Sequence, residues 1–302
     1  MPTTLLTVQE VEEAWQWLLT NISQRPDQPN HAVCTYDRKV FAGQPLNCQS
    51  KTAASNAGRL YLISQVGDVQ AIMEMVNSGV YCSLVYWPRR LDRDVEVVVG
   101  ATERFRNHLS EHLAFWARLA TAAQFPGTGN FMCPKPNFQP EDKGPDGLFV
   151  LNGAVPQIEP QSVKNSISNP SSLIASAGFR SEGRLSAERQ NYHPKQLEGF
   201  YLAHYENWGF GRMDRLLSHT VLLLGMSVSD EIRSALIDRC SYNAVVIADD
   251  QYANGDLFNG YQHVVSDRNR CFATYVGADN WQSFAEEVRR FVLDLLLNAG
   301  VL

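Results

Sequence analysis

The residues whose types and spacing best suit chemistry lie between positions 220 and 236, TVLLLGMSVSDEIRSAL. An apolar run typical of a buried parallel strand ends at Gly225, Ser227 follows, and Asp230 opens a predicted helix. In an open parallel sheet, ligands bind beyond the carboxyl ends of the strands, where a helix N-terminus offers N–H groups to phosphate or ribose oxygens. This segment therefore indicates a nucleotide site, although Ser229 or Asp230 would equally serve as a helix N-cap.

A second candidate nucleotide site is the turn at residues 99–102. It follows a predicted strand, residues 95–99, and precedes a predicted long helix, residues 103–123. Gly100 would let a ligand approach the backbone, and Thr102 would lie at the helix N-terminus as part of a phosphate cradle. If the chain is an unrelated α/β enzyme, this loop is the primary site.

Two further pairs of polar residues have weaker signals. Asp249 and Asp250 follow a predicted strand, where carboxylates either bind ribose hydroxyls or form a solvated turn. His108 and His112 lie four residues apart on the predicted long helix, and we expect them to be exposed rather than to bind a metal. The six cysteines form no CxxC pair, so no metal site is predicted.

Several segments, taken in order, resemble the SIR2-like (sirtuin-type) domain of the bacterial defence-associated kind. Gly225, Ser227 and Asp230 match its closing nucleotide-site motif, while Arg233 lies one residue out of step with that motif. The other segments that carry the resemblance are residues 149–156, 184–192 and 206–218. The resemblance covers roughly residues 148–240 and implies NAD as the ligand.

The activity that this resemblance implies is cleavage of the nicotinamide–ribose bond of NAD, as an NAD hydrolase in antiviral defence. The base of the family is a histidine before glycine, but here Asn152 precedes Gly153, and a carboxamide takes no proton near neutral pH. Asn152 would orient a water or a ribose hydroxyl, and His193 is a candidate replacement for the base. The alternative is a catalytically degenerate SIR2-like scaffold or nucleotide-sensing subunit that binds a partner protein.

The periodicity of the sequence predicts an α/β protein with a Rossmann-like, mostly parallel sheet and helices on both faces. A single domain is expected over residues 1–302, with an N-terminal helix and linker over 1–30. The predicted strands are residues 59–64, 80–87, 95–99, 148–151, 220–226, 243–248 and 272–276. The predicted helices include residues 7–19, 103–123, 227–240 and 279–297, and long irregular loops are expected at 125–147 and 156–183.

Composition excludes several classes of protein. The chain has 302 residues and a net charge of −6, so no nucleic-acid partner is expected. It has no run of 18 apolar residues and no basic, apolar leader, which predicts a cytoplasmic protein without a membrane partner. A homo-oligomer or a protein partner is expected alongside the nucleotide.

Overall fold

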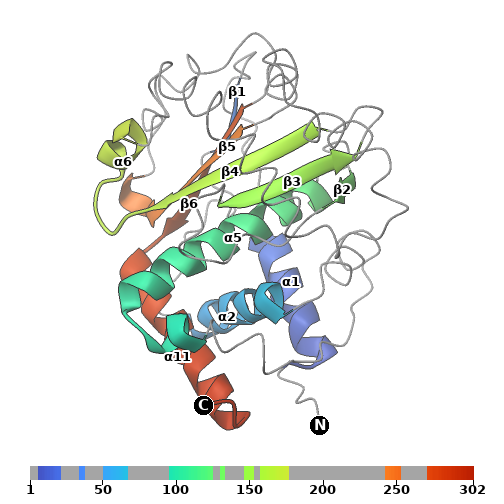
Figure 1. Cartoon of the computed structure of the whole chain (residues 1–302), viewed down its shortest axis with the longest axis vertical. Helices are drawn as coiled ribbons and strands as arrows, with labels where there is room; N and C mark the ends of the chain where they lie inside the picture. Colours follow the sequence, from blue (N-terminus) through green and yellow to red (C-terminus); the bar gives the residue numbers. More distant parts are fainter. Residues whose placement is uncertain are drawn as a thin grey trace, which may run out of the picture.

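The computed structural model describes residues 6–21, 34–37, 50–66, 95–124, 130–132, 146–152, 157–176, 242–252 and 271–302. A sheet of six strands and four long helices make up most of this part of the chain (Figure 1). The predicted segments at 80–87, 220–226 and 227–240 lie outside the described residues.

The sheet is mixed, with four parallel strands beside an antiparallel pair. Its strands, in spatial order, are β1 (Cys34–Asp37), β6 (Cys271–Ala278), β5 (Tyr242–Asp249), β4 (Gln157–Asn165), β3 (Gly147–Asn152) and β2 (Asn130–Met132). β1, β6, β5 and β4 pair in parallel, whereas β3 is antiparallel to both β4 and β2. The carboxyl ends of β4, β5 and β6 therefore meet at one edge, whereas β1 ends at Asp37, level with Thr274 in the middle of β6.

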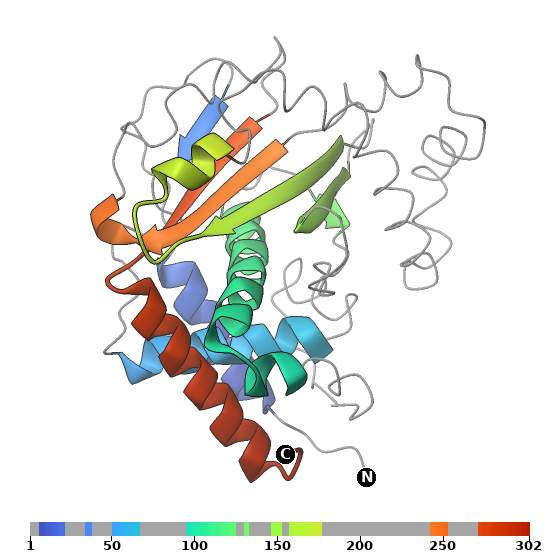
Figure 2. The ribbon, with the colours of Figure 1, turned by 60° about the vertical axis from the view of Figure 1, so that its left-hand side comes forward.

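The long helices lie together on one side of the sheet, as the two views in Figures 1 and 2 show. They are α1 (Val8–Asn21), α2 (Lys51–Val66), α5 (Thr102–Gln124) and α11 (Trp281–Asn298). α5 contacts β3 and β4, and α11 contacts β5 and β6. α2 packs against both α5 and α11, and α1 packs against α2 and α5. Two short elements, α6 (Ser171–Ser176) and the 3-10 turn η2 (Asp250–Tyr252), and a helical segment at residues 95–99 complete the described part. The expected α/β class is confirmed.

The core lies between the sheet and the helices because each long helix turns an apolar stripe inward. α11 buries Trp281, Phe284, Val288, Val292 and Leu296, which recur at helical spacing. Where α1 packs on α5, the ring centroids of Trp15 of α1 and Trp116 of α5 lie 5.9 Å apart. The predicted helices at 7–19, 103–123 and 279–297 and the strands at 148–151, 243–248 and 272–276 are all present.

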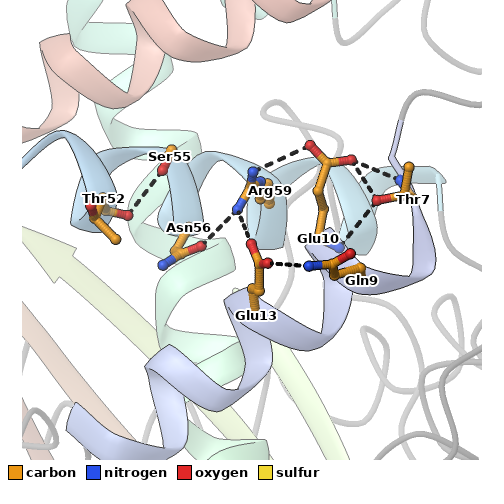
Figure 3. Close-up of polar contacts among 8 residues, drawn as sticks. All are labelled: Thr7, Gln9, Glu10, Glu13, Thr52, Ser55, Asn56 and Arg59. Carbon is orange, nitrogen blue, oxygen red and sulfur yellow. Dashed lines mark hydrogen bonds and ion pairs between the residues drawn. The ribbon is translucent and has the colours of Figure 1, made fainter.

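Arg59 of α2 joins α1 to α2 through a polar network (Figure 3). Its guanidinium contacts the carboxylates of Glu10 and Glu13 over 3.2 and 3.3 Å and also donates to Asn56. Thr7 and Glu10 form a capping box: the Glu10 N–H donates to the Thr7 hydroxyl, and the Thr7 N–H donates to the Glu10 carboxylate. The carboxylate of Glu10 therefore both caps α1 and contacts Arg59 of α2.

The structure corrects the predicted strand at residues 59–64, which lies within helix α2. The run RLYLIS lacks a helical period because Leu60, Tyr61, Leu62 and Ile63 are all buried, between α1, α5 and α11. A helix enclosed on every side has a continuous apolar sequence that looks like a buried strand. Ser50 starts this helix, since its hydroxyl accepts from the N–H of Ala53.

Two other expectations differ from the structure. Residues 95–99 are helical rather than extended, and the carbonyls of Val98, Val99 and Gly100 accept hydrogen bonds from the guanidinium of Arg289 on α11. This long-range contact overrides the strand propensity of the valines. Residues 157–165, expected to be irregular, form β4, whose backbone is paired on both sides by β3 and β5.

Candidate functional site

Polar residues gather at the edge where the parallel strands end. β4 ends at Asn165, β5 ends at Asp249 with Asp250 next to it, and Asp279 and Asn280 follow the end of β6. Helix α11 begins at the same edge with Asn280 as its N-cap, whose side chain accepts from the N–H of Ser283. In open α/β sheets this edge is where ligands bind, so it is the candidate site within the described residues.

Asp249 connects the end of β5 to the start of α11. Its Oδ1 accepts the N–H of Trp281 over 2.7 Å, and its backbone carbonyl accepts the Tyr275 hydroxyl over 2.7 Å. A carboxylate at this position stabilises the helix because it meets the positive end of the helix dipole. One carboxylate oxygen of Asp249 is thus used in a hydrogen bond within the protein.

Asp250 lies against the backbone of β6. The carboxylate of Asp250 is so close to Gly277 that a Cβ added at this glycine would overlap Oδ1. A side chain at position 277 would therefore push the carboxylate of Asp250 away from the backbone of β6. The two neighbouring carboxylates of Asp249 and Asp250 make this edge acidic.

Asn165 ties β4 to two helices. Its Oδ1 accepts from Arg106 Nε and from Trp281 Nε1, each over 3.3 Å. Its Nδ2 donates to Asn107 Oδ1 over 3.0 Å and to Ser110 Oγ over 3.3 Å. Both polar atoms of the Asn165 side chain form hydrogen bonds within the protein. Asn165 therefore holds the end of β4 against α5 and against the start of α11.

The chemistry of this edge suits hydroxyl groups better than phosphate. Among the described residues, Asp249, Asp250 and Asp279 contribute carboxylates there, and Arg106 lies nearby through its bond to Asn165. Ionised carboxylates accept hydrogen bonds from hydroxyls and repel phosphate. Within the described residues, no group of three or more histidine, cysteine, aspartate or glutamate side chains is arranged to hold a metal ion.

The structure places three of the residues that the sequence singled out for a nucleotide site. Gly100 ends the helical segment 95–99: its N–H donates to the Glu96 carbonyl, and a Cβ there would lie 2.6 Å from that oxygen. Thr102 opens α5. Asn152 ends β3, which runs antiparallel to β4, so its backbone lies at the opposite edge of the sheet from Asn165.

The separation of Asn152 from the carboxyl edge is large. Its neighbour Leu151 pairs with Gln157, eight residues before Asn165, which corresponds to roughly 25 Å of strand. Asn152 therefore does not meet Asp249 or Asp250. The remaining residues predicted for this function, His193, Gly225, Ser227 and Asp230, lie outside the described residues.

His108 and His112 form a buried cluster with α2, which corrects their expected exposure. They are 2% and 0% exposed, and their rings lie 4.6 Å apart. The Tyr61 hydroxyl lies 2.9 Å from His108 Nδ1, and the Ser64 hydroxyl is hydrogen-bonded to His112 Nδ1. The sequence missed this cluster because the histidines face α2, itself predicted to be a strand.

A further group of ionisable residues that the sequence did not single out lies where α5 meets the sheet. Asp146 precedes β3, and its Oδ2 accepts the Val163 N–H over 2.5 Å and lies 4.0 Å from Lys164 Nζ. Burial, together with the negative charge of Asp146, raises the pKa of Glu111 on α5 to about 8, although Lys164 opposes this. No periodic signal marks Asp146, which lies in a stretch rich in proline and glycine.

Comparison with known proteins gives no family for this chain. No protein-family model, curated protein or solved structure matches it. Within the described residues, no helix is long and apolar enough to cross a membrane. The SIR2-like resemblance therefore remains a prediction.

Proposed function

We propose that this protein binds NAD or a related nucleotide at the carboxyl edge of its parallel strands. The observation that carries the proposal is the meeting of Asp249 and Asp250 with the start of α11 at this edge. Ligands of open α/β sheets bind there, and a carboxylate at a strand end is a common acceptor for ribose hydroxyls. The SIR2-like resemblance of residues 148–240 supports a Rossmann-like arrangement and NAD as the nucleotide.

The proposed orientation of the bound nucleotide follows from the charge of the carboxyl edge. Asp249 keeps one carboxylate oxygen beyond the one that accepts the Trp281 N–H, and Asp250 lies beside it. The second oxygen of Asp249 and Oδ2 of Asp250 would accept the hydroxyls of a ribose, whereas Oδ1 of Asp250 is buried against Gly277. The acidic edge does not fit a pyrophosphate, which would bind instead at the predicted motif that contains Gly225 and Ser227.

Cleavage of the nicotinamide–ribose bond in antiviral defence is the activity that the resemblance adds to this proposal. The protein would contribute carboxylates that hold the ribose in place while an acceptor attacks. Asn152 lies at the other edge of the sheet, and we therefore expect it to contribute nothing to ribose binding.

The test is calorimetric titration of the purified protein with NAD. Asp250→Asn should weaken binding about tenfold because an amide replaces a charged acceptor. Asp294→Asn, on the exposed surface of α11, is the control and should bind like the wild type. Absence of binding by the wild type, or equal binding by Asp250→Asn, would overturn the proposal.

Chromatography of nicotinamide and ADP-ribose after incubation with NAD tests the hydrolase activity separately. A Ser227→Ala/Asp230→Ala variant should lose turnover, whereas Asn152→His should leave it unchanged. Turnover that survives in the Ser227/Asp230 variant would place the chemistry elsewhere.

A second candidate is a scaffold or sensor that works through a partner protein. The specific observation in its favour is the use of Asn165 and of one Asp249 oxygen in hydrogen bonds within the fold. A scaffold needs this edge to be rigid and needs no ligand there. A wild type that neither binds nor cleaves NAD, yet elutes as an oligomer or with a partner, would support this reading.

A further inference from the structure

Two cysteines begin neighbouring strands of the sheet. Cys34 is the first residue of β1 and Cys271 is the first residue of β6, and these two strands pair in parallel (Figure 2). The register of this pairing makes Cys34 and Cys271 direct partners. The two positions lie near opposite ends of the sequence, so only the strand order brings them together.

The spacing of the two strands suits a disulfide bond. Neighbouring strands run about 4.7–4.9 Å apart, and the Cα atoms of register partners have about this separation. Disulfides join residues whose Cα atoms lie about 4.4–6.8 Å apart, most often about 5.5–6 Å. The partners Cys34 and Cys271 therefore fall at the short end of this range. A disulfide away from the optimal geometry is more easily reduced, which is typical of regulatory rather than permanent bonds.

Both cysteines lie on the same face of the sheet. Register partners share a face, and successive residues of one strand alternate between the two faces. In β6, Val276 and Ala278 belong to the core that the sheet shares with the long helices. Cys271 lies an odd number of positions before both of them. The cysteine pair is therefore on the face turned away from α5 and α11.

A bond between the two cysteines would fasten the strand at one end of the described sheet. β1 has four residues and, among the described strands, pairs only with β6. Such a short strand is held by few backbone hydrogen bonds. The bond would also close a loop that contains most of the chain, which lowers the conformational entropy of the unfolded state. Oxidation should therefore stabilise the folded protein and the attachment of β1.

We propose that Cys34 and Cys271 are a reversible redox-active pair, oxidised to a disulfide by exchange with a low-molecular-weight disulfide such as oxidised glutathione. One cysteine thiolate attacks the reagent, which forms a mixed disulfide and releases one glutathione thiolate. The second cysteine thiolate attacks the protein sulfur of the mixed disulfide and releases the other glutathione thiolate. The two cysteines are oxidised and the reagent is reduced. The two protons that the cysteines lose pass to the two released glutathione thiolates.

This thiol pair is separate from the proposed nucleotide site. Cys271 and Ala278 are the first and last residues of β6, so the pair lies at the amino end of this strand. The carboxyl edge lies at the other end, roughly 23 Å along the strand. The exchange reaction needs no nucleotide, and the proposal is therefore independent of nucleotide binding.

The experiment treats the native protein with oxidised glutathione, alkylates the remaining thiols and identifies the disulfide-linked tryptic peptides by mass spectrometry. Trypsin places the two cysteines in separate peptides, which end at Arg38 and Arg289 and contain no other cysteine. The link between Cys34 and Cys271 should be the main intramolecular product, and an excess of reduced glutathione should remove it. The same treatment in urea should distribute the links over all six cysteines.

Variants test whether the register of β1 and β6 forms the pair. Cys34→Ser/Thr35→Cys moves one thiol by a single position, onto the other face of β1, and should lose the link to Cys271. Cys48→Ser removes a cysteine outside the described residues and should keep the link. In thermal unfolding, the oxidised wild type should unfold about 5 °C or more above the reduced wild type. Cys271→Ser should show no such difference.

Three results would overturn the proposal. The first is the absence of a link between Cys34 and Cys271 in the treated native protein. The second is a link that is no more abundant in the native protein than in urea. The third is a link to Cys271 that persists in Cys34→Ser/Thr35→Cys. The first two results come from the wild type, so they decide the matter even if a variant does not fold.

Discussion

The indole Nε1–H of Trp281 donates to Oδ1 of Asn165 over 3.3 Å, across 116 positions of sequence. This bond joins the start of α11 to the end of β4, and the same amide also holds Arg106, Asn107 and Ser110 of α5. Asn165 therefore fixes the positions of α5 and α11 relative to β4 at the carboxyl edge.

Replacing Asn165 by alanine should reduce the free energy of unfolding by about 2–4 kcal/mol, because several partly buried polar groups lose their partner at once. Asn169→Ala is the control, since Asn169 is exposed and bonds only to Ser171 among the contacts in its turn. Urea denaturation followed by circular dichroism measures both. Equal stability of the two variants would contradict the central role of Asn165.

Gly58→Ala tests the close packing of α2 on α11. A Cβ at position 58 would lie 2.5 Å from Cδ1 of Phe291 and 3.2 Å from Cγ2 of Val292. We expect a net loss of about 1–2 kcal/mol, because the overlap outweighs the better helix propensity of alanine. The double variant Gly58→Ala/Phe291→Ala should lose less than the sum of the single variants. Strict additivity in thermal unfolding would show that the two positions do not touch.

Acid should weaken the contact of α1 with α2 through Glu10. Partial burial pushes the pKa of Glu10 upward, but hydrogen bonds from Thr7 and the charge of Arg59 outweigh it, and the pKa lies below its ordinary value of 4.5. The stabilisation is thus present above pH 4.5 and is lost as the pH falls through the lowered pKa.

The comparison of Glu10→Gln with Glu12→Gln measures this effect, since Glu12 is exposed on the same helix. At neutral pH the Glu10 variant should be less stable by about 0.5–1 kcal/mol. Its stability should then fall less steeply than that of the wild type below pH 4.5. Parallel pH profiles for all three proteins would count against the Glu10–Arg59 contact.

Glu111 should make the protein less stable as the pH rises. Its pKa is about 8 in the folded protein and near 4.5 in the unfolded chain, so the folded state binds the extra proton between these values. Its contribution is complete below pH 4.5 and is lost as the pH rises through 8.

The free energy of unfolding of the wild type should fall by an amount on the order of 2 kcal/mol between about pH 6 and about pH 9, and Glu111→Gln should not show this fall. Denaturation midpoints across this range, with Glu103→Gln as the matched variant, measure the difference. An unchanged slope in Glu111→Gln would mean that Glu111 ionises as freely in the folded state as in the unfolded chain.

The candidate edge was only partly predictable. The pair Asp249 and Asp250 stood out because two carboxylates follow a regular strand. The roles of Asn165 and Trp281 could not be foreseen, since nothing in the local sequence of either indicates a partner 116 positions away. The same is true of Arg289, whose bonds to Val98, Val99 and Gly100 decide the conformation of a valine-rich segment.

The sequence by itself determined the elements whose signals are local. The apolar period of α11, the Thr7–Glu10 capping box and the β-branched run of β5 each identify a structure without help from distant residues. Tertiary structure alone decided the helical form of residues 59–64, the burial of His108 and His112, and the edge at which Asn152 lies. A segment buried on all sides has no period, and the order and direction of strands depend on pairing between distant parts of the chain.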